Sequence, residues 1–351
     1  MSSRARALID MGGAFIPYEP GLEDCWRGIL LYGRNSATYK FALARALLDL
    51  KPTAGQLVKL DALAVPYAQH ICDHLVLAPT QGTSSRSRLV DACRQANRGE
   101  LDREQLLDHT VRFGFNNVID AFHIVGSDEV PHRFFVDERE RSGGIRITDA
   151  FSGLMTGKQV ANLAVETESR WRLVETAWTL GMSPALLKVQ HDTDLGDLFV
   201  EDDLRRRRSI TGARGALSGY QKGHCFYCFE PFSLRGATPP EVDHFFPHSL
   251  KAAEWGGIVD GIWNLVLACR LCNRGKSSRV PSLDMLARLH TRNEYLIGSK
   301  HPLRETLMAQ TGADETTRVG FLNRSYARAR ARRIHVWHST ERGSQHRRFR
   351  G

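Results

Sequence analysis

The residues best suited to chemistry are two Cys-x-x-Cys pairs in the C-terminal half of the 351-residue chain. Cys225 and Cys228 form the first pair, and Cys269 and Cys272 form the second after 40 intervening residues. Four thiolates can surround Zn²⁺ in a tetrahedron, and paired cysteines with this spacing are typical of closed structural zinc sites. The alternative is a set of four buried structural cysteines. We favour zinc over disulfides because the N-terminal residues contain no apolar secretion signal.

Polar residues that suit phosphodiester hydrolysis lie between and just after these pairs. This reaction needs an activated water, a cation near the developing charge and a stabilised leaving oxygen. Asp243 offers a carboxylate and Asn273 an amide oxygen, and oxygen ligands are those that Mg²⁺ prefers. His244 should point to the opposite side of a strand from Asp243, where a neutral imidazole can serve as a general base.

The order of these motifs within residues 224–281 resembles that of a known family. The motifs DH-x-x-P-x-S, a central Asn and NRGKS-x-x-VP are similar to those of the HNH endonucleases, in the variety with a four-cysteine zinc site and a ββα-metal fold. They also resemble the HNH nuclease domain of the CRISPR effector nucleases. The resemblance does not extend to residues 1–200.

The resemblance implies a role for each polar residue. Asp243 and Asn273 would hold the catalytic Mg²⁺ or Mn²⁺, and His244 would be the general base. Asn264 would hydrogen-bond the backbone of the strand that carries Asp243 and His244, and Lys276 would face the phosphate. The last metal-binding position is Asn rather than His, which is a variant within the superfamily.

Positive charge is concentrated in the same part of the chain. Residues 201–351 contain 26 Lys and Arg against 14 Asp and Glu, a net charge of +12, whereas residues 1–200 have a net charge of −3. A basic region of this kind indicates a polyanionic partner. The arginines that we expect to contact nucleic acid are Arg205, Arg206, Arg207, Arg208, Arg274, Arg279, Arg330, Arg332 and Arg333. Alternatively, the run of four arginines is a solvated helix face, a localisation tract or a partner of the acidic N-terminal region.

The hydrophobic pattern predicts an α+β protein in four parts. Residues 1–200 should form a mostly helical domain, in which residues 132–151 form a β-hairpin. Residues 201–222 should form a basic linker or helix, residues 223–281 the zinc-bound ββα-metal module, and residues 282–351 a basic helical extension. The helical windows in the first part cover residues 36–50, 54–77 with a break at Pro66, 84–97, 101–124 and 157–181.

The resemblance therefore implies a metal-dependent endonuclease that acts on DNA, with RNA as the alternative substrate. One such module cuts one strand, so a monomer should nick. The runner-up is a non-catalytic zinc-ribbon module that only binds nucleic acid. No apolar run is long enough to span a membrane, and we expect a cytoplasmic, nucleoid-associated protein. A bacterial anti-phage or restriction role, with protein partners in a defence system, would suit this architecture.

Overall fold

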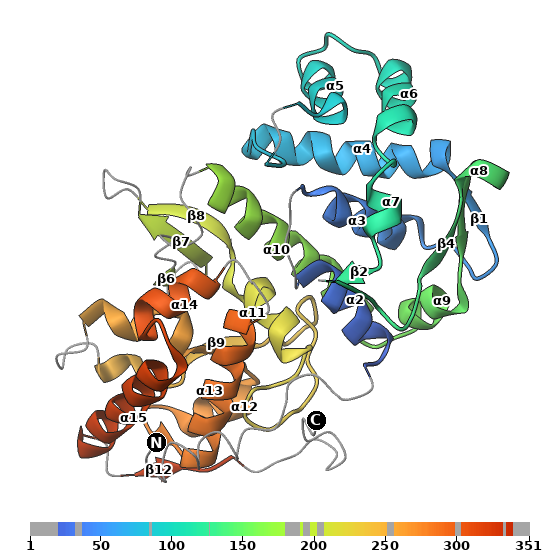
Figure 1. Ribbon diagram of the computed structural model, residues 1–351. Helices are drawn as coiled ribbons and strands as arrows, with labels where there is room; N and C mark the ends of the chain where they lie inside the picture. Colours follow the sequence, from blue (N-terminus) through green and yellow to red (C-terminus); the bar gives the residue numbers. More distant parts are fainter. Residues whose placement is uncertain are drawn as a thin grey trace. The chain divides into compact units, whose positions relative to one another are not determined.

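The computed structural model shows an α+β chain that separates into two compact units (Figure 1). The N-terminal unit is Pro20–Gly181, and the C-terminal unit contains the described residues that follow it. None of the helices in the described residues combines the length and apolar character that a membrane span needs. The structure describes residues 20–31, 37–83, 86–125, 127–179, 190–191, 197–201, 207–250, 256–298, 303–332 and 335–339.

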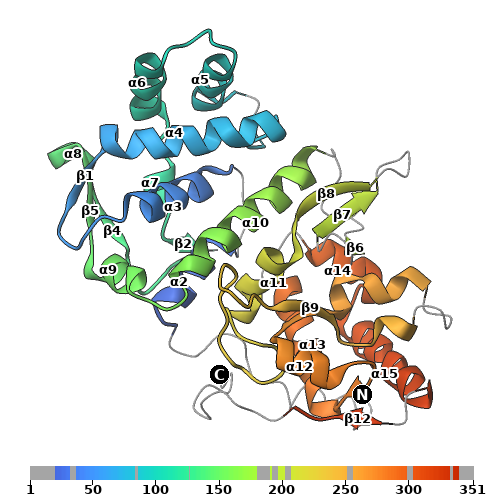
Figure 2. The ribbon, with the colours of Figure 1, turned by 180° about the vertical axis from the view of Figure 1, so that it is seen from behind.

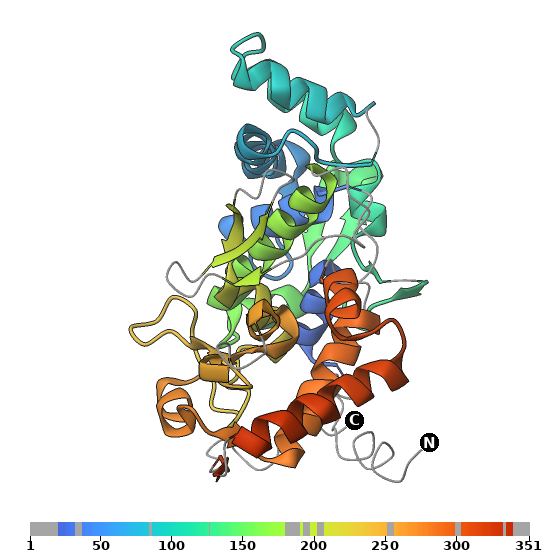
Figure 3. The ribbon, with the colours of Figure 1, turned by 90° about the vertical axis from the view of Figure 1, so that its left-hand side faces the viewer.

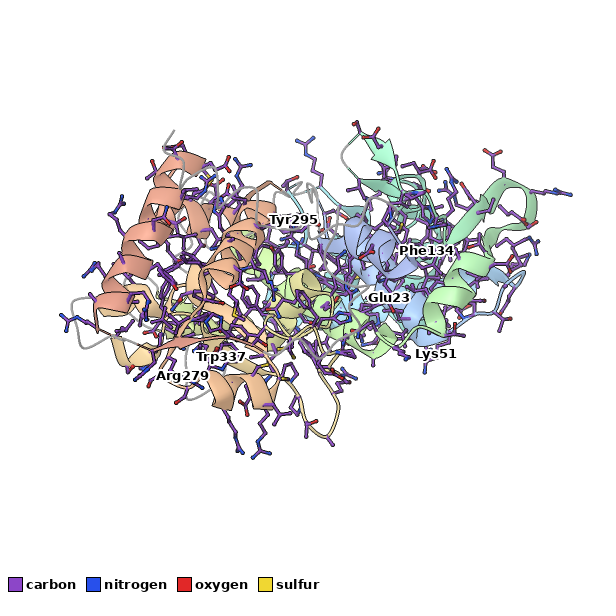
Figure 4. All side chains as sticks on the ribbon, turned by 90° about the horizontal axis from the view of Figure 1, so that it is seen from below. Glu23, Lys51, Phe134, Arg279, Tyr295 and Trp337 are labelled. Carbon is purple, nitrogen blue, oxygen red and sulfur yellow. The ribbon has the colours of Figure 1, made fainter. Side chains whose placement is uncertain are left out.

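The N-terminal unit is mainly helical. Its helices are α2 (Leu22–Leu31), α3 (Tyr39–Leu50), α4 (Leu60–Leu77), α5 (Arg88–Asn97), α6 (Arg103–Phe113), α7 (Val118–Ala121), α8 (Arg139–Ser142), α9 (Asp149–Met155) and α10 (Val160–Thr179). Helix α4 lies between α3 and the pair α5 and α6 (Figure 1). Trp26 of α2 is buried at the centre of an aromatic core, where its ring packs against Phe122, Phe134 and Phe151. Figure 4 shows Phe134 within this unit.

The predicted hairpin is present. Strands β4 (Phe135–Glu138) and β5 (Gly144–Ile147) pair antiparallel, and the single-turn helix α8 and Gly143 connect them. Strand β1 (Leu57–Lys59), within a window predicted as helix, adds a third strand against β5. This close pairing requires Gly144, because a Cβ there would lie 2.2 Å from the carbonyl oxygen of Val58. A further two-stranded sheet pairs β2 (Ile124–Val125) with β3 (Asp128–Glu129).

The predicted helix break at Pro66 was wrong. Helix α4 runs from Leu60 to Leu77 with Pro66 inside it. A proline removes a single backbone donor from the helix interior. Leu63, Tyr67 and Ile71 are fully buried on both sides of it. Burial of this apolar stripe outweighs the lost hydrogen bond.

The C-terminal unit begins with a small sheet and contains the predicted module. Its elements are β6 (Gln190–His191), β7 (Asp197–Glu201), β8 (Arg207–Gly212), α11 (Ala213–Gln221), β9 (Glu241–His244), β10 (Leu265–Ala268), α12 (Arg270–Lys276), β11 (Val280–Pro281), α13 (Leu283–Gly298), α14 (Arg304–Thr311), α15 (Glu315–Arg332) and β12 (Val336–Trp337). Helices α14 and α15 pack against α13 (Figure 3). The predicted four-part division of the chain stays a prediction.

The basic stretch 201–222 is not simply a linker or helix. Arg207 and Arg208 begin strand β8, which pairs antiparallel with β7, and α11 follows. β-branched residues such as Ile210 favour this strand. Arg205 and Arg206 lie outside the described residues.

Candidate functional site

The site is built on two antiparallel strands and the helix that follows them. Strand β9 ends at His244, which lies opposite Leu265 of β10, and Asp243 lies opposite Val266. The chain leaves β10 through Cys269, the N-terminal cap of α12. Helix α11 packs against the same two strands (Figure 2). This ββα arrangement brings the two cysteine pairs and the polar motifs together.

The four cysteines gather into one cluster. Their sulfur atoms all lie within 4.8 Å of one another, and the Sγ atoms of Cys228 and Cys269 are 3.8 Å apart. Zinc–sulfur bonds of about 2.3 Å in a tetrahedron place the sulfurs about 3.8 Å apart. The cluster therefore has the donor set and the size that fit a zinc ion.

Thiol electrostatics also fit a bound cation. Hydrogen bonds among the thiols lower the pKa values of Cys228 and Cys269, whereas they raise that of Cys225. Four sulfurs this close cannot all be ionised without a positive charge between them, and a divalent cation supplies that charge.

Helix α13 supports the first cysteine pair. Arg288 donates hydrogen bonds to the carbonyl oxygens of Phe226 and Tyr227 at 2.6 and 3.1 Å, and its guanidinium covers the ring of Phe229. On the other side, Gln221 of α11 donates to the carbonyl oxygen of His224 at 2.9 Å. The first pair is thus fixed by two helices outside the motif itself.

The chain after α12 closes the other side of the cluster. Strand β11 pairs in parallel with β12, and Pro281 lies opposite Trp337. Figure 4 shows Trp337 near Arg279, the residue just before β11. The ring of Trp337 packs edge-on against Tyr227 at 4.9 Å. The basic extension is therefore integrated with the zinc-type module by pairing and packing.

Asp243 is buried and held by two partners. Its carboxylate accepts a hydrogen bond of 2.6 Å from the Tyr227 hydroxyl, and the other oxygen lies 3.0 Å from Nζ of Lys276. Burial raises the pKa of the Asp243 carboxyl, although the Lys276 ammonium and the Tyr227 hydrogen bond oppose the rise. The Lys276 side chain is only 1% exposed. In this structure Lys276 therefore faces Asp243, and its predicted contact with phosphate stays a prediction.

His244 has a different carboxylate partner. Its Nε2 atom lies 3.1 Å from Oδ1 of Asp260, and Nε2 of the exposed His248 lies 3.4 Å from the same oxygen. Asp260 ends a 3₁₀ segment, Gly256–Asp260, just before the second strand. A carboxylate in this position can fix the orientation and tautomer of an imidazole.

Asn264 holds together the backbone segments that carry His244 and Asp260. Its side chain accepts a hydrogen bond from the backbone N–H of Phe246 at 2.8 Å and donates to the carbonyl oxygens of Phe246 and Val259. Phe246 follows His244 by two residues, and Val259 precedes Asp260. The fully buried Asn264 thus joins the segments that carry both partners.

Buried Arg292 reinforces this loop from α13. Its guanidinium donates to the carbonyl oxygens of Leu265, Ile262 and Trp263 at 2.6 to 3.1 Å. Burial lowers the pKa of Arg292 to about 10, so the group stays charged near neutral pH. The side chain therefore satisfies the carbonyl groups around Asn264.

Both expected ligands of the catalytic metal lie on the α12 side of β9. Nδ2 of Asn273 donates to Oε2 of Glu241 at 2.6 Å, while Asp243 contacts Lys276 of the same helix. Glu241 and Asp243 are two residues apart on a strand, so they share a face. Carboxylate and amide oxygens suit a hard divalent cation. The donor set thus fits such an ion, and Glu241 adds a carboxylate that the motifs did not single out.

The expected nucleic-acid-binding arginines are only partly described. Arg274 of α12, Arg279 after it and Arg332 of α15 have exposed side chains, and Arg330 is half-buried. Side-chain positions of Arg207 and Arg208 are not described, and Arg205, Arg206 and Arg333 lie outside the described residues. Contact of these arginines with nucleic acid stays a prediction.

Together, the strands, the helix and the thiol cluster define a small ββα module with a tetrathiolate zinc-type centre. Residues 225–279 match the family model of the HNH endonuclease. No curated protein and no solved structure was similar enough to match the chain. The segment is therefore an HNH endonuclease domain with a four-cysteine cluster, as the motifs predicted, and such a domain indicates a function in nucleic-acid cleavage.

Proposed function

We propose that the protein is a divalent-metal-dependent DNA endonuclease whose general base is His244. The observation that carries this proposal is the contact between His244 and Asp260 at the end of β9, within an HNH domain. Asp243 and Asn273 would hold the catalytic Mg²⁺ or Mn²⁺ on the neighbouring face. When bound, this ion would supply positive charge near the phosphate that is attacked.

The histidine would take the proton from the attacking water. If Nε2–H donates to Asp260, the lone pair of the ring belongs to Nδ1, which then accepts the proton. Asp260 would stabilise the imidazolium that forms. Asn264 would hold His244 and Asp260 in position relative to each other through its contacts with the backbone of Phe246 and Val259. Glu241 would orient the side chain of Asn273.

We propose DNA as the substrate and a single-strand nick as the product. The positive charge of residues 201–351 supports a polyanionic substrate, and DNA rather than RNA rests on analogy with the family. One module contains one such site, so we expect a monomer to nick double-stranded DNA. A role in bacterial anti-phage defence or restriction, in the cytoplasm near the nucleoid, would fit a nuclease joined to a separate helical unit.

A non-catalytic zinc module is the second candidate. The engagement of Asp243 by both Tyr227 and Lys276 favours it, because a carboxylate held by two partners can be purely structural. In that case the protein would bind nucleic acid without cutting it. The two candidates differ in whether a divalent metal produces cleavage.

The deciding experiment is a titration of Mg²⁺ and Mn²⁺ with supercoiled plasmid. We expect nicked circles from the wild type. Asp243→Ala and Asn273→Ala should each require more metal for cutting, with the larger increase for Asp243→Ala because it removes a charge. Arg98→Gln, an exposed residue of the N-terminal unit, is the matched control. Plasmid binding without nicking at any metal concentration would instead support the non-catalytic module.

A further inference from the structure

A large cavity in the N-terminal unit has a markedly positive lining. It has a volume of about 770 Å³, and its lining residues include the starts of α3 and α5, the end of α6 and residues of helix α7. Its charged lining residues are Lys40, Arg86, Arg88 and Arg94, and no Asp or Glu lines it among the described residues. Ligand pockets typically have volumes of about 300–1,000 Å³. The cavity is therefore large enough for a small organic anion.

Lys40 is the lining residue best suited to bind an anion. Its side chain is half-buried, and Nζ donates to the carbonyl oxygen of Ile124 at 2.8 Å. Burial lowers its pKa to about 8, and no carboxylate among the described residues counteracts this shift. The side chain is still mostly protonated at pH 7. A partly desolvated cation of this kind gains from an anionic ligand.

Arg88 and its neighbours offer stacking surfaces and hydrogen-bonding groups that suit a nucleobase. The Arg88 guanidinium lies 4.9 Å from the centre of the Phe113 ring, and arginine planes and aromatic rings are surfaces on which bases stack. The exposed amides of Asn116 and Asn117 can donate to and accept from a base edge. The apolar side chains of Leu89, Val90 and Val118 line the same cavity.

We propose that this cavity binds a phosphate-bearing nucleotide, with Lys40 and Arg88 contacting its phosphate and base. The nucleotide is either free or part of a nucleic-acid strand. This site is separate from the HNH domain, and its occupancy does not depend on cleavage. It gives the N-terminal unit a recognition function of its own.

Equilibrium dialysis of the full-length protein with ATP, without added divalent metal, tests the proposal. We expect saturable binding of one ATP per chain. Lys40→Gln and Arg88→Gln should each weaken it about tenfold or more, since each removes a charged contact. Arg112→Gln is the matched control, because Arg112 is an exposed arginine of α6 that pairs with Asp108 outside the cavity. It should change the affinity less than twofold.

A second probe identifies the source of the nucleotide. Tighter binding of a 5′-phosphorylated thymidine dinucleotide than of ATP, with the same loss in Lys40→Gln, assigns the cavity to a nucleotide within a strand. Tighter binding of ATP assigns it to a free nucleotide. The proposal is overturned if neither probe binds below about 1 mM, if Arg112→Gln weakens binding as much as Arg88→Gln, or if inorganic phosphate displaces ATP at equal concentration. Thermal unfolding of each variant verifies that it is folded.

Discussion

Nε2 of His244 lies 3.1 Å from Oδ1 of Asp260, a residue 16 positions further along the chain. Both side chains are largely buried, and Asn264 connects their backbone segments through its hydrogen bonds with Phe246 and Val259. A carboxylate bound to one ring nitrogen fixes the orientation and tautomer of an imidazole. The relationship makes Asp260 the positioning residue of the proposed base.

Asp260→Asn should therefore lower the rate of nicking by about ten- to a hundredfold, a typical effect of removing a residue that orients a functional histidine. DNA affinity and zinc content should stay unchanged, because Asp260 belongs neither to the four-cysteine cluster nor to the arginines that we expect to contact nucleic acid. Single-turnover cleavage at saturating DNA measures the effect. His248→Ala removes the exposed neighbour of Asp260 and should have less than a threefold effect. A normal rate for Asp260→Asn would show that this carboxylate does not position the base.

Loss of one cluster cysteine should unfold the HNH domain. A structural zinc ion contributes on the order of 10 kcal/mol to the folding of a small domain, and Cys225→Ser removes one of the four donors. Metal analysis of the wild type should find one zinc per chain, and Cys225→Ser should lose it together with nicking. Cys25→Ser changes a buried cysteine of the N-terminal unit and should retain zinc. Wild-type protein without zinc would disprove this assignment.

Neutralising Arg205–Arg208 to glutamine should weaken binding to all DNA sequences alike. Arginines that contact phosphates release counterions, so log affinity falls with log salt concentration by about 0.9 for each phosphate contacted. The variant should therefore show a shallower salt dependence and a normal nicking rate at saturating DNA. Filter binding between low and moderate salt measures both affinity and slope. An increase in basal nicking without weaker binding would indicate instead that these arginines pair with an acidic partner.

The stability of the N-terminal unit should depend on pH through His74. Burial alone would lower the pKa of His74, but hydrogen bonds with Glu168 and Glu175 raise it above 6.5. A group with a raised folded-state pKa stabilises fully below its unfolded value, and this contribution is lost as pH rises through the folded value. The difference in free energy of unfolding between wild type and His74→Gln should therefore shrink as the pH rises above 6.5. Urea unfolding followed by tryptophan fluorescence measures it, and a constant difference would contradict the assignment.

Much of the HNH domain could be predicted because its chemistry depends on short spacings. Two Cys-x-x-Cys pairs form knuckles wherever they meet one metal, and adjacent Asp243 and His244 separate onto two faces of a strand. The four-cysteine cluster and the match to the HNH family confirm the predicted cysteine-bearing module, whereas the roles of Asp243 and His244 stay predictions. The resemblance also singled out Asn264 for contacts with the strand that carries Asp243 and His244; its contacts fall at Phe246, two residues beyond His244, and its role stays a prediction.

Residues that act through tertiary contacts could not be predicted in this way. Asp260 ends a short 3₁₀ segment that contains two glycines, and in such a sequence an aspartate is usually a turn residue. Arg288 and Arg292 lie on a helix, where arginines usually face solvent, yet they bind backbone carbonyl groups of the domain. Lys40 and Arg88 are 48 residues apart in sequence and line the same cavity because α3 and α5 both pack against α4.

The central claim is tested most directly by the rate at which His244→Ala nicks supercoiled plasmid in saturating Mg²⁺. Loss of the base should reduce this rate by about a hundredfold or more, while zinc content, thermal unfolding and DNA affinity match the wild type. Cleavage by His244→Ala at close to the wild-type rate would contradict the proposed mechanism.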